Sequence, residues 1–178
     1  LPDLTAVVDG PLFLTGDSSR QSVEGTLHIR KAVYEKRIDL RQAVIAWLTR
    51  ETEPLPADAP FFSAARLNLH LHGKENIAIK NNIAKVALEV DLDLKGTLNA
   101  PLLFGQVHIP KGTFYFQANE FKVTSGTVQF VHPAKIDPSF DIRGQSRVRN
   151  YTVDLALTGH LSQFNLALSS LPPLPDPE

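Results

Sequence analysis

The stretch that decides the fold runs from Leu92 to Phe130 and reads LDLKGTLNAPLLFGQVHIPKGTFYFQANEFKVTSGTVQF. Alternation with period two places side chains on one face of a pleated strand. Apolar residues alternate in this way at Leu92 and Leu94, Val107 and Ile109, Phe114 and Phe116, Phe121 and Val123, and Val128 and Phe130. Turn-forming residues separate the pairs at Gly96, Asn99-Ala100-Pro101, Gly105, Gly112, Asn119 and Ser125-Gly126. We therefore predict short antiparallel strands joined by turns, rather than parallel βαβ units.

The rest of the chain follows the same pattern, with one interruption. We expect strands at 4–8 and 11–15 around an Asp9-Gly10 turn, and a strand at 21–34 with Val23, Leu27, Ile29 and Val33 on one face. Further strands are expected at 64–72, 76–80, 84–95, 139–149, 151–159 and 163–168. The proline-rich tail at 172–178 cannot continue a sheet, so we expect it to be extended.

The interruption is a helical period at residues 39–50. Leu40, Val44, Trp47 and Leu48 recur at helical spacing, and Asp39 with Gln42 forms a plausible capping box. Three prolines between 54 and 60 end the segment. We predict one short helix whose Trp47 stripe packs on the apolar face of the sheet.

Composition excludes several classes of function. The chain has 178 residues and a net charge of −1, which argues against nucleic-acid binding. It has no cysteine, which excludes disulfides and cysteine-based zinc sites. No window approaches 18 apolar residues, and no signal peptide or methionine is present. We therefore expect a segment of a longer protein, with any targeting signal or membrane anchor outside it.

Two stretches 80 residues apart resemble each other. Leu12-x-Leu14-x-Gly16 aligns with Leu92-x-Leu94-x-Gly96, and the run from Gly25 to Ala32 aligns with the run from Gly105 to Gly112. The second pair shares glycine, histidine, isoleucine and lysine at the same spacing. We interpret the match as an internal duplication, although any meander can reuse the Leu-x-Leu-x-Gly unit.

Candidate chemistry is sparse. His70 and His72 share the polar face of a strand, but no cluster of histidine and aspartate is evident nearby, so we predict no metal and no cofactor. Asp137, Asp141 and Asp154 lack a signature context, and no catalytic motif is present, so we predict no enzyme activity. Arg143, Arg147 and Arg149 are interpreted as solvated charges, with contact to anionic headgroups as the alternative.

A sheet with one apolar face must bury it on something, and one short helix cannot cover about ten strands. Two solutions remain open. The sheet can close on itself as a sandwich or barrel, which is the usual fate of alternating strands. Alternatively, it can curl into an open trough whose lining is covered by a ligand.

The ordered glycine series resembles a known family. Gly105-x-Val107-x-Ile109-x-x-Gly112-x-Phe114-x-Phe116, followed by the Asn119–Phe130 series, is similar to the TamB C-terminal domain family. The pattern continues through Pro138–Ile142, Tyr151–Gly159 and Ser169–Leu174. The resemblance covers about residues 85–174, whereas residues 1–84 match only in style. We treat residues 1–178 as a single segment with two parts, about 1–84 and about 85–171, before the tail.

The resemblance implies a fold and a function. It implies a mainly β fold, an elongated antiparallel sheet curled into an open trough (a β-taco) with an apolar interior and one short helix near 39–50. It implies a section of a periplasmic conduit that carries phospholipids between the inner and outer membranes. The full-length protein would be anchored in the inner membrane. The alternative is an assembly factor for outer-membrane proteins or autotransporters, which accepts client β-strands beside a TamA-like outer-membrane barrel protein.

Under the trough interpretation, the apolar positions of the strands bind acyl chains. We call this set the predicted lining: Leu67, Leu69, Leu71, Ile77, Ile79, Val86, Leu88, Val90, Leu92, Leu94, Val107, Ile109, Phe114, Phe116, Phe121, Val123, Val128, Phe130, Phe140, Ile142, Val153, Leu155, Leu157, Phe164, Leu166 and Leu168.

Overall fold

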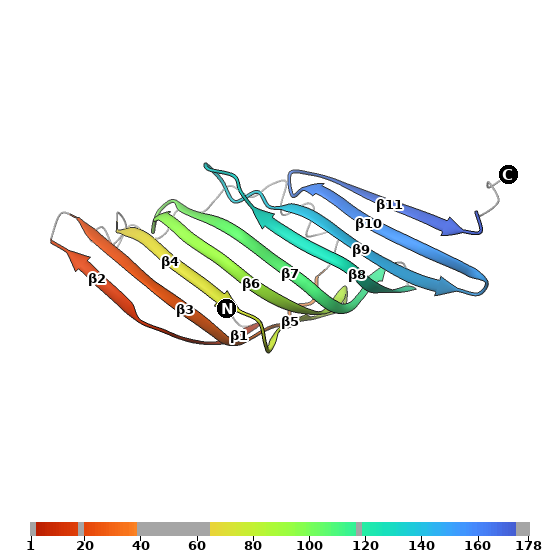
Figure 1. Ribbon diagram of the computed structural model, residues 1–178, viewed down its shortest axis with the longest axis horizontal. Coiled ribbons are helices and arrows are strands. Elements are labelled where there is room, and N and C mark those ends of the chain that lie inside the picture. The colour runs from red at the N-terminus through yellow and green to blue at the C-terminus, as the bar shows by residue number, and fades with distance from the viewer. Residues whose placement is uncertain (1–2, 18–19, 39–64, 117–118, 174–178) are drawn as a thin grey trace.

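The fold is mainly β, as predicted from the sequence (Figure 1). The computed structural model describes residues 3–17, 20–38, 65–116 and 119–173, and every regular element in these ranges is a strand. The helix predicted at 39–50, with Trp47, lies outside the described residues.

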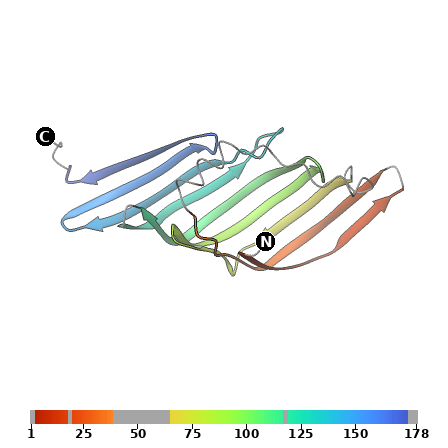
Figure 2. The same ribbon diagram turned by 180° about the vertical axis from the view of Figure 1, so that it is seen from behind.

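In the part of the chain that the structure describes, eleven strands make up one sheet, and most of them run from one margin of the sheet to the other. They are β1 (Leu4–Asp9), β2 (Leu12–Gly16), β3 (Gln21–Tyr34), β4 (Arg66–Gly73), β5 (Ile77–Lys80), β6 (Ala84–Thr97), β7 (Pro101–Phe116), β8 (Asn119–Phe130), β9 (Ser139–Val148), β10 (Tyr151–His160) and β11 (Gln163–Leu171). Figure 2 shows the same band of strands from behind, with β1–β3 at one end and β11 at the other.

The strand order is β1-β3-β4-β6-β7-β8-β9-β10-β11, with β2 beside β3 and β5 between β3 and β6. Neighbours are antiparallel except that β3 runs parallel to β4 and to β5. The prediction of antiparallel pairing is therefore wrong at this one junction. The reason is topological: the chain leaves β3 at one margin of the sheet and enters β4 at the opposite margin.

Asp9-Gly10 does not form the predicted hairpin turn. Asp9 pairs with His28 and Leu12 pairs with Gly25, so β1 and β2 lie in line along the same strand, β3. Gly10 has a φ of +143°, and Pro11 lacks an N–H group. Together they interrupt the hydrogen-bond ladder without reversing the chain, because the next residues resume pairing with β3.

The prediction that Gly96, Gly105, Gly112 and Gly126 stand at turns between short strands is also wrong. All four lie inside β6, β7 or β8, which are 14, 16 and 12 residues long. Gly105 and Gly112 have φ values of +106° and +145°, which non-glycine residues rarely adopt. They bend β7 while it stays paired to β6 on both sides of a register shift between Ala87 and Glu89.

The 80-residue repeat is reproduced in the register of the sheet. Leu12 pairs with Gly25 as Leu92 pairs with Gly105, and Val7 pairs with Lys31 as Ala87 pairs with Lys111. The register shift falls at the same place in both copies, after Val7 and after Ala87. Because of this shift, Val33 and Ile29 lie on opposite faces of the sheet. The prediction that the two residues share a face is therefore wrong. The β1/β2–β3 unit therefore has the same construction as the β6–β7 unit.

The strand ends form two long margins. One contains the β5–β6 turn at 81–83 and the β9–β10 turn at 149–150, and we call it the Asn82 margin. The other contains the turns at 98–100 and 161–162, and we call it the Ser162 margin. The most buried apolar cluster, formed by Ala84, Val86, Ile109 and Ile142, lies on the central strands β6, β7 and β9.

Asp137 ties two connections together at the Ser162 margin. Its carboxylate accepts hydrogen bonds from the Ser162 backbone N–H at 3.0 Å and the Ser162 hydroxyl at 2.9 Å, and Lys135 Nζ lies 3.0 Å away. The Lys135 ammonium and the Ser162 donors lower the pKa of Asp137 to about 2. The ionised carboxylate thus fixes the β8–β9 connection to the β10–β11 turn.

Changing Gly105 to alanine should destabilise the fold strongly. A Cβ there would lie 2.3 Å from the Asp91 carbonyl oxygen, in a backbone conformation that disfavours side chains. We expect a loss of roughly 2 kcal/mol or more, measured by urea denaturation. Gly144→Ala is the control, because its new Cβ would meet its nearest atoms at 3.2 Å. Equal losses in both variants would contradict the role assigned to Gly105.

Asp137→Asn should make the melting temperature depend less on pH in the acidic range. Because the folded pKa of Asp137 is lowered, its stabilisation is present above the unfolded pKa, near 3.8, and is lost as pH falls towards about 2. The melting temperature of the wild type should fall across this window more steeply than that of the variant. Asp154→Asn, whose carboxylate accepts a hydrogen bond from the neutral Gln145 amide, is the control. Parallel profiles for wild type and D137N would refute this assignment.

Candidate functional site

The predicted lining lies entirely on one face of the sheet. Rows of paired residues show this directly: Val90 pairs with Val107, Val107 with Val128, and Val128 with Phe140. The row continues through Gly159 to Phe164 on the last strand. The remaining members of the set alternate along the same strands, in phase with this row across each register shift. The sequence therefore predicted that these residues share one face, although Leu103, Val148 and Tyr151 lie on it too and were not predicted.

The lining is buried in its middle and exposed at its ends. Val86, Ile109 and Phe121 are 3–5% exposed, whereas Phe164 is 53% and Leu168 is 48% exposed. The central residues are covered by their neighbours along the bent strands, while β11 has a strand partner on one side only. The apolar surface is thus continuous but unevenly covered.

The lining also extends beyond the predicted set at its other end. Leu12 pairs with Gly25 and Leu14 with Val23, on the face that includes Leu67, the partner of Val23 on β4. Leu12 is 56% and Leu14 is 65% exposed. The sequence showed the alternation in residues 11–15. The predicted Asp9-Gly10 hairpin, however, paired these residues with 4–8, so their position beside β3 at the edge of the sheet was missed.

No second layer faces the lining within the described residues. All eleven strands belong to one sheet, whose order ends at β1/β2 on one side and β11 on the other (Figure 1). A closed barrel would pair those two edges, and a sandwich would divide the strands between two sheets. The described strands do neither, so an apolar face runs from one end strand to the other.

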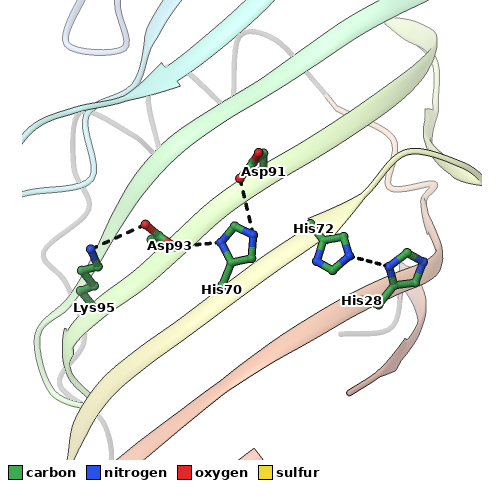
Figure 3. A network of polar contacts seen from close by, with 6 residues as sticks. All are labelled: His28, His70, His72, Asp91, Asp93 and Lys95. Carbon is green, nitrogen blue, oxygen red and sulfur yellow. Dashed lines mark hydrogen bonds and ion pairs between the residues drawn. The ribbon is translucent and has the colours of Figure 1, made fainter. Parts of the chain in front are cut away.

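The outer face carries a polar network across β3, β4 and β6 (Figure 3). His28 Nδ1 lies 2.8 Å from His72 Nε2, so one of the two rings donates a hydrogen bond to the other. His70 Nδ1 lies 2.9 Å from Asp93, and His70 Nε2 lies 3.7 Å from Asp91. The expectation that no cluster of histidine and aspartate surrounds His70 and His72 is therefore wrong, because β6 brings Asp91 and Asp93 opposite them.

This network is well suited to holding strands together. The hydrogen bond from His70 is the main cause that lowers the pKa of Asp93, and Lys95, with its Nζ 3.6 Å from Asp93, adds to it. Within the ranges that the structure describes, no group of three or more histidine, cysteine, aspartate or glutamate residues converges on a point that could hold a metal ion. The network thus joins β4 to β6 and β3 to β4 by polar contacts.

The other charged residues considered as candidates lie apart from one another. Asp141 is paired with Arg143 at 3.1 Å on the outer face of β9. Asp154 accepts a hydrogen bond from the Gln145 amide at 2.9 Å, and Asp137 fixes the Ser162 margin. Arg149 lies in the β9–β10 turn, away from Arg143. The three aspartates therefore do not form one site, and one of the three arginines, Arg143, is paired with Asp141.

Comparison with known proteins extends the resemblance. The part of the chain that the structure describes contains no helix long and apolar enough to cross a membrane. No curated protein matched the chain in a sequence search. The family profile described as the TamB C-terminal domain matches residues 1–178, so the match includes residues 1–84 as well as the glycine series. The chain therefore belongs to the TamB C-terminal domain family.

Proposed function

We propose that this domain is a section of an apolar conduit that carries phospholipids between the inner and outer membranes. Its family acts in the translocation and assembly module and in outer-membrane biogenesis, which places the domain in the cell envelope. The observation that carries the proposal is the apolar face that continues from β2 to β11, which no second layer of strands faces within the described residues and which is exposed at both end strands. An apolar surface of this extent marks a binding surface.

The energetics favour a lipid as the occupant. Each methylene group of an acyl chain that leaves water for the lining gains about 0.8 kcal/mol. The charged headgroup can remain in water at a margin of the sheet, which avoids the cost of burying an unpaired charge. The predicted lining contains only aliphatic and phenylalanine side chains. Such a surface binds acyl chains by burying apolar area and not by directional hydrogen bonds, so a lipid can slide along it.

The proposed mechanism is passive and uses no catalytic residue. We propose that the domain is not an enzyme, and that movement follows the lipid gradient or an energy source elsewhere in the envelope. The family works with TamA, the outer-membrane barrel protein of the module. In this proposal, a full-length protein anchored in the inner membrane delivers lipid towards that barrel through the lining of this domain.

A charge placed in the lining should block lipid passage without always unfolding the domain. Leu92 and Phe116 are half-buried, so an aspartate at either position can reach water, and melting should change little. Ile109 is 5% exposed, so Ile109→Asp should destabilise the fold by several kcal/mol. Photo-crosslinking probes at Leu92 and Phe116 of the full-length protein should capture phospholipid, and Leu92→Asp should abolish capture beyond the charge.

The control places the same charge on the outer face. Gln129 lies between Val128 and Phe130 on β8 and is exposed, so Gln129→Asp should alter neither melting nor lipid capture. Probes at Asp91 and Asp93 should capture little lipid, because they lie on the outer face. The conduit proposal is wrong if probes at Leu92 and Phe116 capture none, or if the Asp91 and Asp93 probes capture as much.

A second candidate function is supported by the end strands. β11 pairs only with β10, and its sequence QFNLALSSL contains no charge and no proline. Soluble proteins usually protect such an edge with lysine, proline or a bulge. An extended client strand could pair with β11 by β-augmentation, as expected of an assembly factor for outer-membrane proteins.

Hydrogen exchange distinguishes this second candidate. A peptide with the alternating pattern of an outer-membrane β-strand should slow exchange of backbone amides in β11 if the edge accepts clients. His160 and Gln163 close a two-residue hairpin, so hydrogen-bonded pairs alternate from there and the Leu166 amide points away from β10. Leu166→Pro removes this amide from the free edge and should weaken the effect, whereas Ala156→Pro in β10, an interior strand, should unfold the domain locally. Unchanged exchange in β11 at saturating peptide would count against client binding at this edge.

A further inference from the structure

Three lysines meet on the outer face beside the Asn82 margin. Lys80 on β5 pairs with Lys85 on β6, and Lys111 on β7 pairs with Ala87, two residues from Lys85. Together with Val86, Ala87 and Gly112 they line a hollow of about 400 Å³. We call Lys80, Lys85 and Lys111 the lysine cluster. It brings together residues from three strands, so the linear sequence does not reveal it.

The lysine cluster is not neutralised by the protein. All three side chains are exposed, and none forms an ion pair within the described part of the chain. Some basic residues on the same sheet are paired instead: Arg30 with Asp9, Lys95 with Asp93, and Arg143 with Asp141. Like charges directly opposite each other on adjacent strands are destabilising. An anionic partner at the cluster would remove that repulsion.

The surroundings strengthen the positive field at this margin. Lys85 Nζ lies 5.6 Å from the centre of the Tyr115 ring, a neutral neighbour. Lys122, Arg147 and Arg149 follow on β8, on β9 and in the β9–β10 turn, towards the same margin. The acidic residues at this margin are Glu35, which follows the Tyr34–Ile79 pair, Glu120, which pairs with Tyr115, and Asp154, whose carboxylate is engaged by the Gln145 amide. The Asn82 margin therefore carries an excess of positive charge.

The lysine cluster stands directly behind the deepest part of the lining. Lys85 lies between Ala84 and Val86, which are 4% and 3% exposed on the opposite face. Lys80 and Lys85 flank the turn at 81–83, so both lie within a residue or two of the margin, and a strand rises only about 3.3 Å per residue. The four-carbon stems of Lys80 and Lys85 can therefore bring their ammonium groups to the edge, whereas Lys111, opposite Ala87, lies further from it along the hollow.

The turn itself holds an unused hydrogen-bond donor. Asn81 Oδ1 accepts hydrogen bonds from the backbone N–H groups of Ile83 and Ala84, which fixes the side chain. Asn81 Nδ2 is buried and has no hydrogen-bond partner. Asn81 follows Lys80 directly in the chain, and buried donors are nearly always paired, so this orphaned donor in the turn points to an acceptor such as a phosphate oxygen.

From these observations we propose that the lysine cluster binds the phosphate headgroup of an anionic phospholipid whose acyl chains lie on the lining. The inference rests on the conduit function proposed above and adds a preference to it. Anionic lipids should be held in favour of zwitterionic ones, because the zwitterionic headgroup carries its own cation and gains less from three ammonium groups. The domain would then select its cargo by headgroup charge at one margin.

The test compares bound lipid with supplied lipid. The 178-residue chain is incubated with vesicles of phosphatidylcholine and phosphatidylglycerol, re-isolated, and its bound lipid is quantified by mass spectrometry. We expect phosphatidylglycerol to be enriched roughly 10-fold or more over its share in the vesicles, since each lysine near an anionic surface contributes a several-fold effect. The triple variant Lys80→Gln, Lys85→Gln, Lys111→Gln should bind both lipids in the vesicle ratio.

The matched control removes three other charges. Arg20, Arg66 and Lys74 are exposed and form no ion pair within the described ranges; Arg20 and Arg66 lie at the Ser162 margin, and Lys74 lies in the β4–β5 connection, outside the hollow. Their triple change to glutamine alters net charge equally and should preserve the enrichment. Circular dichroism of both triple variants should match the wild type, because all six side chains are on the surface.

The outcomes separate this inference from the conduit itself. Wild-type protein that binds lipid in the vesicle ratio, or a lysine variant that keeps the enrichment, overturns the lysine cluster but leaves the conduit intact. Protein that binds neither lipid overturns both. Inorganic phosphate, added at constant ionic strength, is the remaining arm. If it abolishes the enrichment as effectively as the lysine variant does, the cluster is a phosphate site rather than a lipid-headgroup site, and the inference fails.

Discussion

The structure depends on keeping one face of a single-layer sheet apolar over eleven strands. A slip of one residue would turn every following side chain to the other face. The chain meets this requirement even where its strands bend. In β7 the lining residues change from odd to even numbers, from Val107 and Ile109 to Phe114 and Phe116, and in β8 from Phe121 and Val123 to Val128 and Phe130. Each change coincides with a register shift. The extra residue at the bend therefore keeps the apolar side chains on the same face of the sheet.

This parity change explains what the sequence could and could not reveal. Most of the lining between Leu67 and Leu168 was predicted, because alternation is a local property, but Leu103, Val148 and Tyr151 on the same face were missed. The strand lengths were not predicted, because a glycine with positive φ serves a turn and a bulge equally well. Gly112 continues β7 only because β6 lies opposite it, with Val86 as its partner. The parallel β3–β4 junction and the pairing of His70 with Asp93 escaped prediction for the same reason: both arise between segments far apart in sequence.

The repeated unit shows how such a sheet is extended. Leu4 to Gly16 against β3 has the register of Ala84 to Gly96 against β7, including the shift and the carboxylate–histidine pairs Asp9–His28 and Glu89–His108. Each unit brings its own bend and its own phase correction. A copy can therefore be added without disturbing its neighbours, which is the property of quasi-one-dimensional folds. Duplication here lengthens the sheet and does not add a second layer to its core.

In an open sheet, the two margins both adjoin the lining and can carry different groups. A closed core has no such margins. In a barrel or sandwich the lining would be sealed, and exposed residues such as Leu14 and Phe164 would be buried against each other. In the sheet as it stands, a molecule on the lining is never far from water at a margin, and the margins differ. Asp137 and its partners close the connections at the Ser162 margin, whereas free lysines surround the Asn82 margin. An amphiphile on the lining would therefore lie in an asymmetric field, with its charged end favoured at one margin and its chains on the apolar face.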